Sequence, residues 1–158
     1  MRKYERAGIV SVESIIGLIR LDNSHNSVEL FGHKVALMSN RIKSLKFNGA
    51  KCAACGIEGI YFAVERCEHK LKNERDWHLN IYALTYKLDE VMMTRDHVIP
   101  KSKGGSDDYR INSQTLCTHC NRRKADKVVY AETEWSNTGT DIGNSSEEHN
   151  LARLCRLA

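Results

Sequence analysis

The chain has 158 residues, of which 41% are apolar and 28% charged, and its formal net charge is +4. This composition is typical of a globular protein, and the absence of a run of about eighteen apolar residues excludes a membrane-spanning helix. The apolar stretch 9–21 follows a basic start, but Glu13 interrupts it and no small-residue cleavage site follows, so we expect no signal peptide. The length fits one domain with a modest core, which a structural metal would help to stabilise.

The positive charge is concentrated in one segment. Residues 95–127 contain eight Lys or Arg and four Asp or Glu, an excess that equals the net charge of the whole chain. A basic surface attracts polyanions through Coulomb forces and counterion release, so a nucleic acid is the expected partner. A solvated basic helix face is the alternative explanation of such a cluster.

The first half of the chain predicts short elements. Residues 1–24 give weak helical signals, and alternating apolar residues predict two strands at 27–31 and 34–37, with Gly32 near the turn. Ser39 is the expected N-cap of a helix that runs to about Phe47 and ends at Asn48-Gly49.

The second half predicts more strands and one helix. Strands are expected at 60–64, 77–84, 91–99 and 114–116, the third ending at Pro100, with a charged loop or hairpin extension at 65–76. A polar Gly-Gly loop at 101–110 and a helix at 118–130 complete this part. We expect three regions: an extension over 1–50, a zinc-bearing domain over 51–130, and a loose tail over 131–158 that includes a short amphipathic segment at 147–157.

Six cysteines occur, and four of them form two Cys-x-x-Cys pairs: Cys52, Cys55, Cys117 and Cys120. Two thiolates at this spacing reach one tetrahedral ion, so the pairs predict a structural zinc site that joins the two halves of the chain. A single pair would also suit a redox motif, and unrelated buried thiols are the alternative for both. Metal-binding thiols favour the reducing cytoplasm of a bacterial or phage-infected cell, and Cys67 and Cys155 are expected to be free.

The strand that reaches Asp96-His97 carries the strongest chemical signal. Neighbouring strand residues point to opposite faces, so Asp96 can hold a cation while His97 reaches toward a substrate. A carboxylate suits Mg²⁺, and a neutral imidazole suits proton abstraction from water. At the start of the next helix, Asn121 can offer a carbonyl oxygen to the same cation, and Lys124 lies one turn later on the same face.

Four motifs occur in order: Asp96-His97-Val-Ile-Pro, Gly104-Gly105, Asn112-x-Gln-x-Leu-Cys117 and Cys120-Asn121-x-x-Lys124. Together they resemble the ββα-metal motif of the HNH endonuclease family, in its zinc-bearing branch with two Cys-x-x-Cys pairs. The resemblance covers residues 94–127, or 51–127 with the first cysteine pair. It implies an α+β fold with a ββα-metal core, to which the N-terminal hairpin and helix are an extension.

The resemblance also implies site roles. His97 would be the general base, Asp96 and Asn121 would hold one Mg²⁺ or Mn²⁺, and Asn112 would hydrogen-bond within the loop to fix the backbone and ring of His97. Many relatives have His where this chain has Asn121, and an amide oxygen favours hard cations. The expected activity is hydrolysis of phosphodiester bonds in double-stranded DNA, leaving 5′-phosphate and 3′-hydroxyl ends.

Basic residues near this motif are the expected contacts to DNA phosphate: Lys101, Lys103, Arg122, Arg123, Lys124 and Lys127. Such contacts carry little sequence information, so specificity would come from other segments, from a homodimer or from a recruiting protein. A zinc-ribbon module that binds nucleic acid without cutting it is the first alternative function, and a protein that uses its cysteines for stability alone is the second. Homing, restriction and phage genome processing remain open as biological roles.

Overall fold

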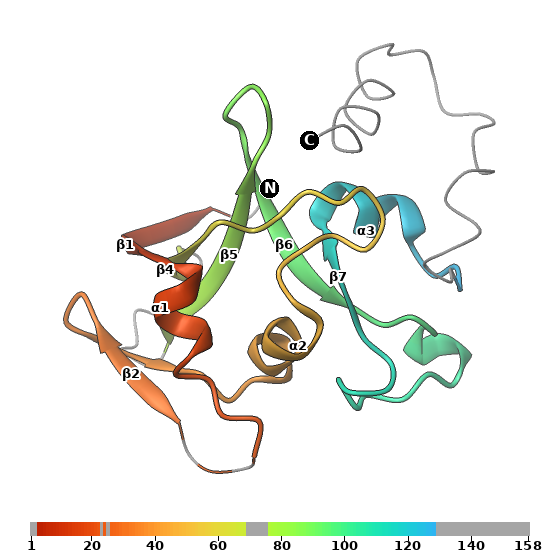
Figure 1. The fold of residues 1–158 in the computed structure, drawn as a ribbon, viewed down its shortest axis with the longest axis horizontal. Helices are drawn as coiled ribbons and strands as arrows, with labels where there is room; N and C mark the ends of the chain where they lie inside the picture. Colours follow the sequence, from red (N-terminus) through yellow and green to blue (C-terminus); the bar gives the residue numbers. More distant parts are fainter. Residues whose placement is uncertain (1–2, 23, 25, 69–75, 129–158) are drawn as a thin grey trace.

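The computed structural model of the chain describes residues 3–22, 24, 26–68 and 76–128. Its main element is a five-stranded antiparallel sheet in the order β1-β4-β5-β6-β7, with a separate β2-β3 hairpin (Figure 1). The strands are β1 (Tyr4–Ser11), β2 (Ser27–Leu30), β3 (His33–Ala36), β4 (Tyr61–Cys67), β5 (His78–Leu84), β6 (Glu90–Asp96) and β7 (Gln114–Cys117). The helices are α1 (Val12–Ile16), α2 (Asn40–Asn48), the 3-10 turn η2 (Lys101–Lys103) and α3 (Thr118–Lys124). The mixed α+β class is therefore confirmed.

The first strand differs from the weak helical signal of the N-terminus. β1 pairs with β4 from Tyr4 opposite Cys67 to Ser11 opposite Tyr61, with a bulge between Arg6 and Gly8. Gly8 packs under the ring of Phe31, where an added Cβ would lie 2.5 Å from ring atoms. The weak helical signal of residues 1–24 is thus wrong for residues 4–11, because pairing with a distant strand decides their conformation.

The core lies between one face of the sheet and the N-terminal elements. Apolar residues of α1, α2 and β3 pack against those of β4, β5 and β6, and each of the following is almost fully buried: Ile15, Val35, Ile42, Leu45, Phe62, Val64, Leu79, Ile81 and Met93. The β2-β3 strands and α2 agree with the prediction, and the Ser39 hydroxyl accepts a hydrogen bond from the Ile42 amide as the expected N-cap.

The charged segment 65–76 is expected to be a loop or a hairpin extension, and β4 continues through its first residues to Cys67. Glu65 is 2% exposed and accepts hydrogen bonds from Arg6 Nε (2.8 Å), Asn80 Nδ2 (2.7 Å) and the Tyr82 hydroxyl (2.9 Å). These partners, supplied by β1 and β5, offset the cost of burying a carboxylate and keep it within the sheet.

The last part of the described chain forms a strand-loop-strand-helix unit. β6 ends at Asp96, three residues before the expected end at Ile99, and the loop that follows contains η2. β7 returns antiparallel to β6, and α3 packs against both strands (Figure 1). α3 ends at Lys124 rather than near residue 130, since Ala125 adopts a positive φ of 51°. The predicted tail and the 147–157 segment lie outside the described residues.

Candidate active site and metal centre

Both Cys-x-x-Cys pairs meet in one cluster. The sulfur atoms of Cys52, Cys55, Cys117 and Cys120 all lie within 4.8 Å of one another. Tetrahedral zinc with bonds of about 2.3 Å separates its sulfurs by roughly 3.8 Å, so the spacing is close to that of a zinc site. The four residues predicted from the sequence are therefore brought together, in a cluster compatible with a zinc knuckle.

Local backbone structure prepares the cluster for a metal. Gly56 has a φ of 79° and turns the first pair, with its amide bonded to the Cys52 carbonyl. Cys117 ends β7 and caps α3, because its sulfur accepts a hydrogen bond from the Cys120 amide. The Cys117 amide in turn donates to Cys52 Sγ at 3.3 Å. Hydrogen bonds from the neighbouring thiols, first of all that of Cys117, hold the pKa of Cys52 below its usual range, whereas the hydrogen bond with Cys117 raises the pKa of Cys120.

Alternate residues at the end of β6 face two different surroundings. Thr94 and Asp96 face Gln114 of β7 and the helix α3, whereas Arg95 and His97 contact Asp107 in the loop after η2. This division follows from the alternation of side chains along a strand, as the sequence predicts. The candidate metal ligands and the candidate base therefore flank the same strand end.

Asp96 is largely buried and has two partners. Its Oδ2 accepts a hydrogen bond from Gln114 Nε2 at 2.9 Å and lies 3.1 Å from Lys124 Nζ. The same ammonium donates to the carbonyl of His97 at 2.8 Å, and the Lys124 side chain is 1% exposed. The expectation that Lys124 contacts DNA phosphate is therefore wrong for this structure: the face of α3 that it shares with Asn121 packs against β6.

Asn121 also reaches β6. Its Nδ2 donates to Thr94 Oγ1 at 2.9 Å, and Thr94 Oγ1 donates to the Leu116 carbonyl at 2.9 Å. Among the described residues, none donates a hydrogen bond to Asn121 Oδ1, so this oxygen can serve another group. Thr94 and Asp96 lie on the same face of β6 (Thr94 opposite Leu116, Asp96 opposite Gln114), and Asn121 and Lys124 meet them one turn apart on α3.

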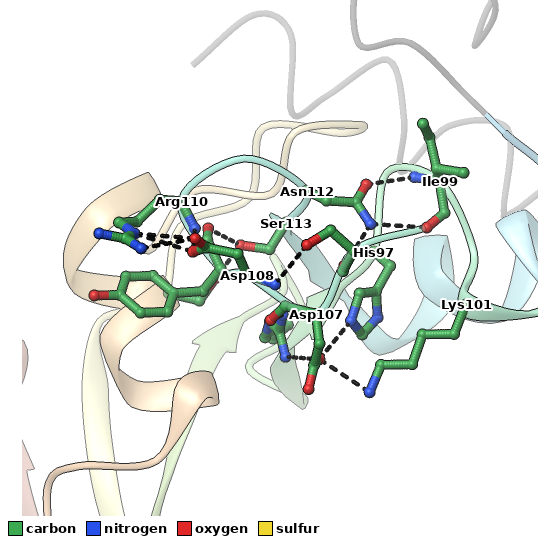
Figure 2. A network of polar contacts seen from close by, with 12 residues as sticks. His97, Ile99, Lys101, Asp107, Asp108, Arg110, Asn112 and Ser113 are labelled. Atoms are coloured by element: carbon green, nitrogen blue, oxygen red, sulfur yellow. Dashed lines mark hydrogen bonds and ion pairs between the residues drawn. The ribbon is translucent and has the colours of Figure 1, made fainter. Parts of the chain in front are cut away.

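The imidazole of His97 is held from one side. Its Nε2 lies 3.0 Å from Asp107 Oδ1, and the side chain is 22% exposed (Figure 2). Asp107 Oδ1 also lies 3.0 Å from Lys101 Nζ and 3.1 Å from Arg95 Nη1. These hydrogen bonds, first of all that from His97, hold the pKa of Asp107 well below its usual range, so Asp107 is ionised at neutral pH. Asp107 is not among the site residues predicted from the sequence.

Asn112 braces the loop between the two motif strands. Its Oδ1 accepts a hydrogen bond from the Ile99 amide at 2.8 Å, and its Nδ2 donates to the carbonyls of Ile99 (2.9 Å) and Ser106 (2.7 Å). The loop bonding expected of Asn112 is thus present at Ile99, two residues after His97, but the ring of His97 contacts Asp107 instead. Gly105 completes the brace: a Cβ there would lie 1.8 Å from the Ile99 carbonyl oxygen.

The other candidate phosphate contacts lie at the surface. Five basic residues from η2, from α3 and from the turn after it are exposed: Lys101, Lys103, Arg122, Arg123 and Lys127. Lys101 is committed in part to Asp107, and Arg123 Nη2 approaches Cys120 Sγ at 3.8 Å. Positive charge is therefore exposed on η2 and on α3 with the turn that follows it, and it would attract a polyanion to this surface.

Comparison with known proteins agrees with the geometry. Residues 85–127 match the family model described as HNH endonuclease. No curated protein and no solved structure matches the chain. Within the part of the chain that the structure describes, no helix has the length and apolar character needed to cross a membrane. Residues 85–127, which span β6, β7 and α3, are therefore similar to an HNH endonuclease domain, and they contain two of the four cysteines of the cluster compatible with zinc.

Proposed function

We propose that the chain is a metal-dependent endonuclease that hydrolyses phosphodiester bonds in double-stranded DNA. The observation that carries this proposal is the hydrogen bonding of His97: Nε2 lies 3.0 Å from Asp107 Oδ1, and none of the described residues makes a hydrogen bond to Nδ1. An imidazole held on one nitrogen and open on the other is suited to remove a proton from water. The HNH domain match supports a nucleic acid as the substrate.

The chemistry is a displacement at phosphorus. His97 Nδ1 takes a proton from a water molecule, whose oxygen forms a bond to phosphorus while the bond to the 3′ oxygen breaks. The leaving oxygen takes a proton from solvent, which gives a 3′-hydroxyl and a 5′-phosphate. Exposed charges on Lys103, Arg122 and Lys127 would hold the DNA backbone beside the site.

Two side chains on the side of β6 away from Asp107 fit a hard cation: Asp96 of the strand and Asn121 of α3. Asp96 offers a carboxylate and Asn121 a carbonyl oxygen, and these are the donor types that Mg²⁺ and Mn²⁺ prefer. A cation bound there would neutralise negative charge that develops on the phosphate and the leaving oxygen. Asp96 Oδ1 is the more open oxygen, because its contact with Lys124 Nζ is 3.4 Å long, compared with 3.1 Å for Oδ2.

One observation favours a different function. Lys124 already compensates the negative charge of Asp96, so the folded arrangement of these side chains does not require a divalent ion. In that case the cysteine cluster and the basic surface would form a module that binds nucleic acid without cutting it.

A plasmid-nicking assay separates the two functions. Zinc-loaded wild type and His97→Ala are compared on supercoiled DNA with Mg²⁺, after circular dichroism has confirmed that both are folded. We expect the wild type to nick the plasmid and the variant to be slower by about 10²–10⁴-fold, the usual contribution of a general base. Equal rates would contradict the assigned mechanism, and binding without cleavage by the wild type would favour the non-catalytic module.

A further inference from the structure

Asp107 has three side-chain partners, Arg95, His97 and Lys101, although its own side chain is 53% exposed. Arg95 forms two hydrogen bonds with Asp107: Nη1 donates to Oδ1 at 3.1 Å, and Nη2 donates to the backbone carbonyl at 2.7 Å. Arg95 itself is only 10% exposed and comes from β6, two residues before His97. The strand that leads directly into His97 therefore also fixes the position of the carboxylate that the imidazole contacts.

The contact with Asp107 decides which nitrogen of His97 carries the proton. An ionised carboxylate can only accept hydrogen bonds, so Nε2 must be the donor at 3.0 Å. The neutral ring then has its lone pair on Nδ1, the nitrogen to which none of the described residues makes a hydrogen bond. The same hydrogen bond limits rotation of the ring about its bond to Cβ.

We propose that Asp107 is a positioning residue for His97, which holds the ring in the orientation and tautomer that present the Nδ1 lone pair to water. This inference rests on the proposed nuclease function. Asp107 acts through the imidazole and touches neither substrate nor cation. Its two other partners, Arg95 and Lys101, keep the carboxylate ionised and in place beside the ring (Figure 2).

A purely structural role for Asp107 is the competing explanation. It would tie Arg95 to the loop and place Lys101, and the approach of His97 would be incidental. The two explanations differ in one observable: only a positioning role requires a persistent hydrogen bond from the His97 ring.

The test uses the neighbouring carboxylate as its control. Asp108 is paired with Arg110 at 2.8 Å and does not contact His97 (Figure 2). Asp107→Ala and Asp108→Ala are prepared in the full chain with zinc and checked for fold by circular dichroism. Nitrogen-15 labelling of histidine then reports the imidazole N–H protons by NMR at about pH 8, where an ordinary imidazole is neutral. The His97 signal is assigned by its loss in His97→Ala.

We expect a resolved Nε2–H proton for His97, protected from exchange with water, in the wild type and in Asp108→Ala but not in Asp107→Ala. Single-turnover cleavage at saturating DNA should be slower by about 10²-fold in Asp107→Ala, the cost of a misplaced reacting group. Asp108→Ala should stay within about a factor of three of the wild type, as for most surface substitutions. Since Asp107→Ala removes a negative charge beside Lys101, its affinity for DNA should not fall.

Several results would overturn the inference. A wild-type spectrum in which His97 carries its proton on Nδ1 would do so without any substitution, so the test survives even if Asp107→Ala fails to fold. Loss of the Nε2–H signal with an unchanged cleavage rate would do so as well. A wild type that shows the signal but never cleaves DNA would support the hydrogen bond and reject the proposed nuclease function instead.

Discussion

The ammonium of Lys124 lies 3.1 Å from Asp96 Oδ2, and both side chains are withdrawn from solvent. A buried lysine beside a buried carboxylate keeps each charge compensated, and removal of one partner leaves the other without its counter-charge. The same ammonium bonds the His97 carbonyl, so one side chain of α3 ties together the two adjacent residues that the proposed mechanism uses.

Lys124→Met tests this relationship. Without Mn²⁺ but with zinc bound, the variant should lose about 3 kcal/mol in its free energy of unfolding, because Asp96 keeps only the hydrogen bond from Gln114. Its affinity for Mn²⁺ should rise by about tenfold or more, since the cation no longer competes with a fixed positive charge. Urea unfolding and calorimetric titration with Mn²⁺ measure the two effects. The exposed Lys127→Met is the control, and an unchanged Mn²⁺ affinity in Lys124→Met would exclude competition for Asp96.

Gly105→Ala tests the loop that follows His97. Its Cβ would meet the Ile99 carbonyl oxygen at 1.8 Å and Asn112 Nδ2 at 2.7 Å, so the backbone must move and the brace must open. We expect a loss of about 2–3 kcal/mol in unfolding free energy, typical of overpacking, and slower cleavage. Gly17→Ala is the control, because its Cβ would meet only the Glu13 carbonyl oxygen at 4.0 Å. Equal stability of the two variants would show that the loop tolerates displacement.

Zinc removal should unfold the protein, because the cysteine cluster joins the turn after α2 to the end of β7. A zinc-selective chelator should abolish the far-ultraviolet circular dichroism of the folded chain, while dialysis against buffer without Mg²⁺ should leave it intact. Cys52→Ser should act like chelation, and Cys67→Ser, which alters a thiol outside the cluster, should not. If fully zinc-free protein kept its secondary structure, the prediction that zinc holds these two parts of the fold together would be contradicted.

Salt dependence of DNA binding tests the basic surface. Arg122→Ala and Lys103→Ala should each reduce the slope of log affinity against log salt by about 0.9, the value for one lost phosphate contact. Lys34→Ala, exposed on β3 away from the HNH domain, should leave the slope unchanged. If all three variants had the same slope of log affinity against log salt, Arg122 and Lys103 would not contact DNA phosphate.

The cysteine cluster could be predicted from the sequence because its signal is local. Two Cys-x-x-Cys pairs fix ligand type and spacing without knowledge of the fold, and the four sulfurs are indeed together. The α2 helix was equally accessible, since Ser39 and Gly49 mark its ends. The roles of Asp96, Asn112 and Asn121 rest on the family resemblance and stay predictions, as do the region boundaries near residues 50 and 130.

Other features depend on contacts between distant parts of the chain. Nothing near Asp107 in the sequence shows that the chain, ten residues after His97, returns to it. Lys124 has the helical spacing of a surface residue as well as of a buried one, and only the packing of α3 on β6 distinguishes them. β1 becomes a strand by pairing with β4, which local propensity cannot show.

Chemical rescue of His97→Gly tests directly whether His97 is the general base, because added imidazole replaces only the missing side chain. The zinc-loaded variant is assayed on supercoiled plasmid with Mg²⁺, with and without added imidazole. We expect the variant to be inactive alone and its cleavage rate to rise with imidazole concentration, whereas Asp96→Ala should not be rescued. Cleavage by His97→Gly at the wild-type rate without imidazole would contradict the assignment of His97 as the base.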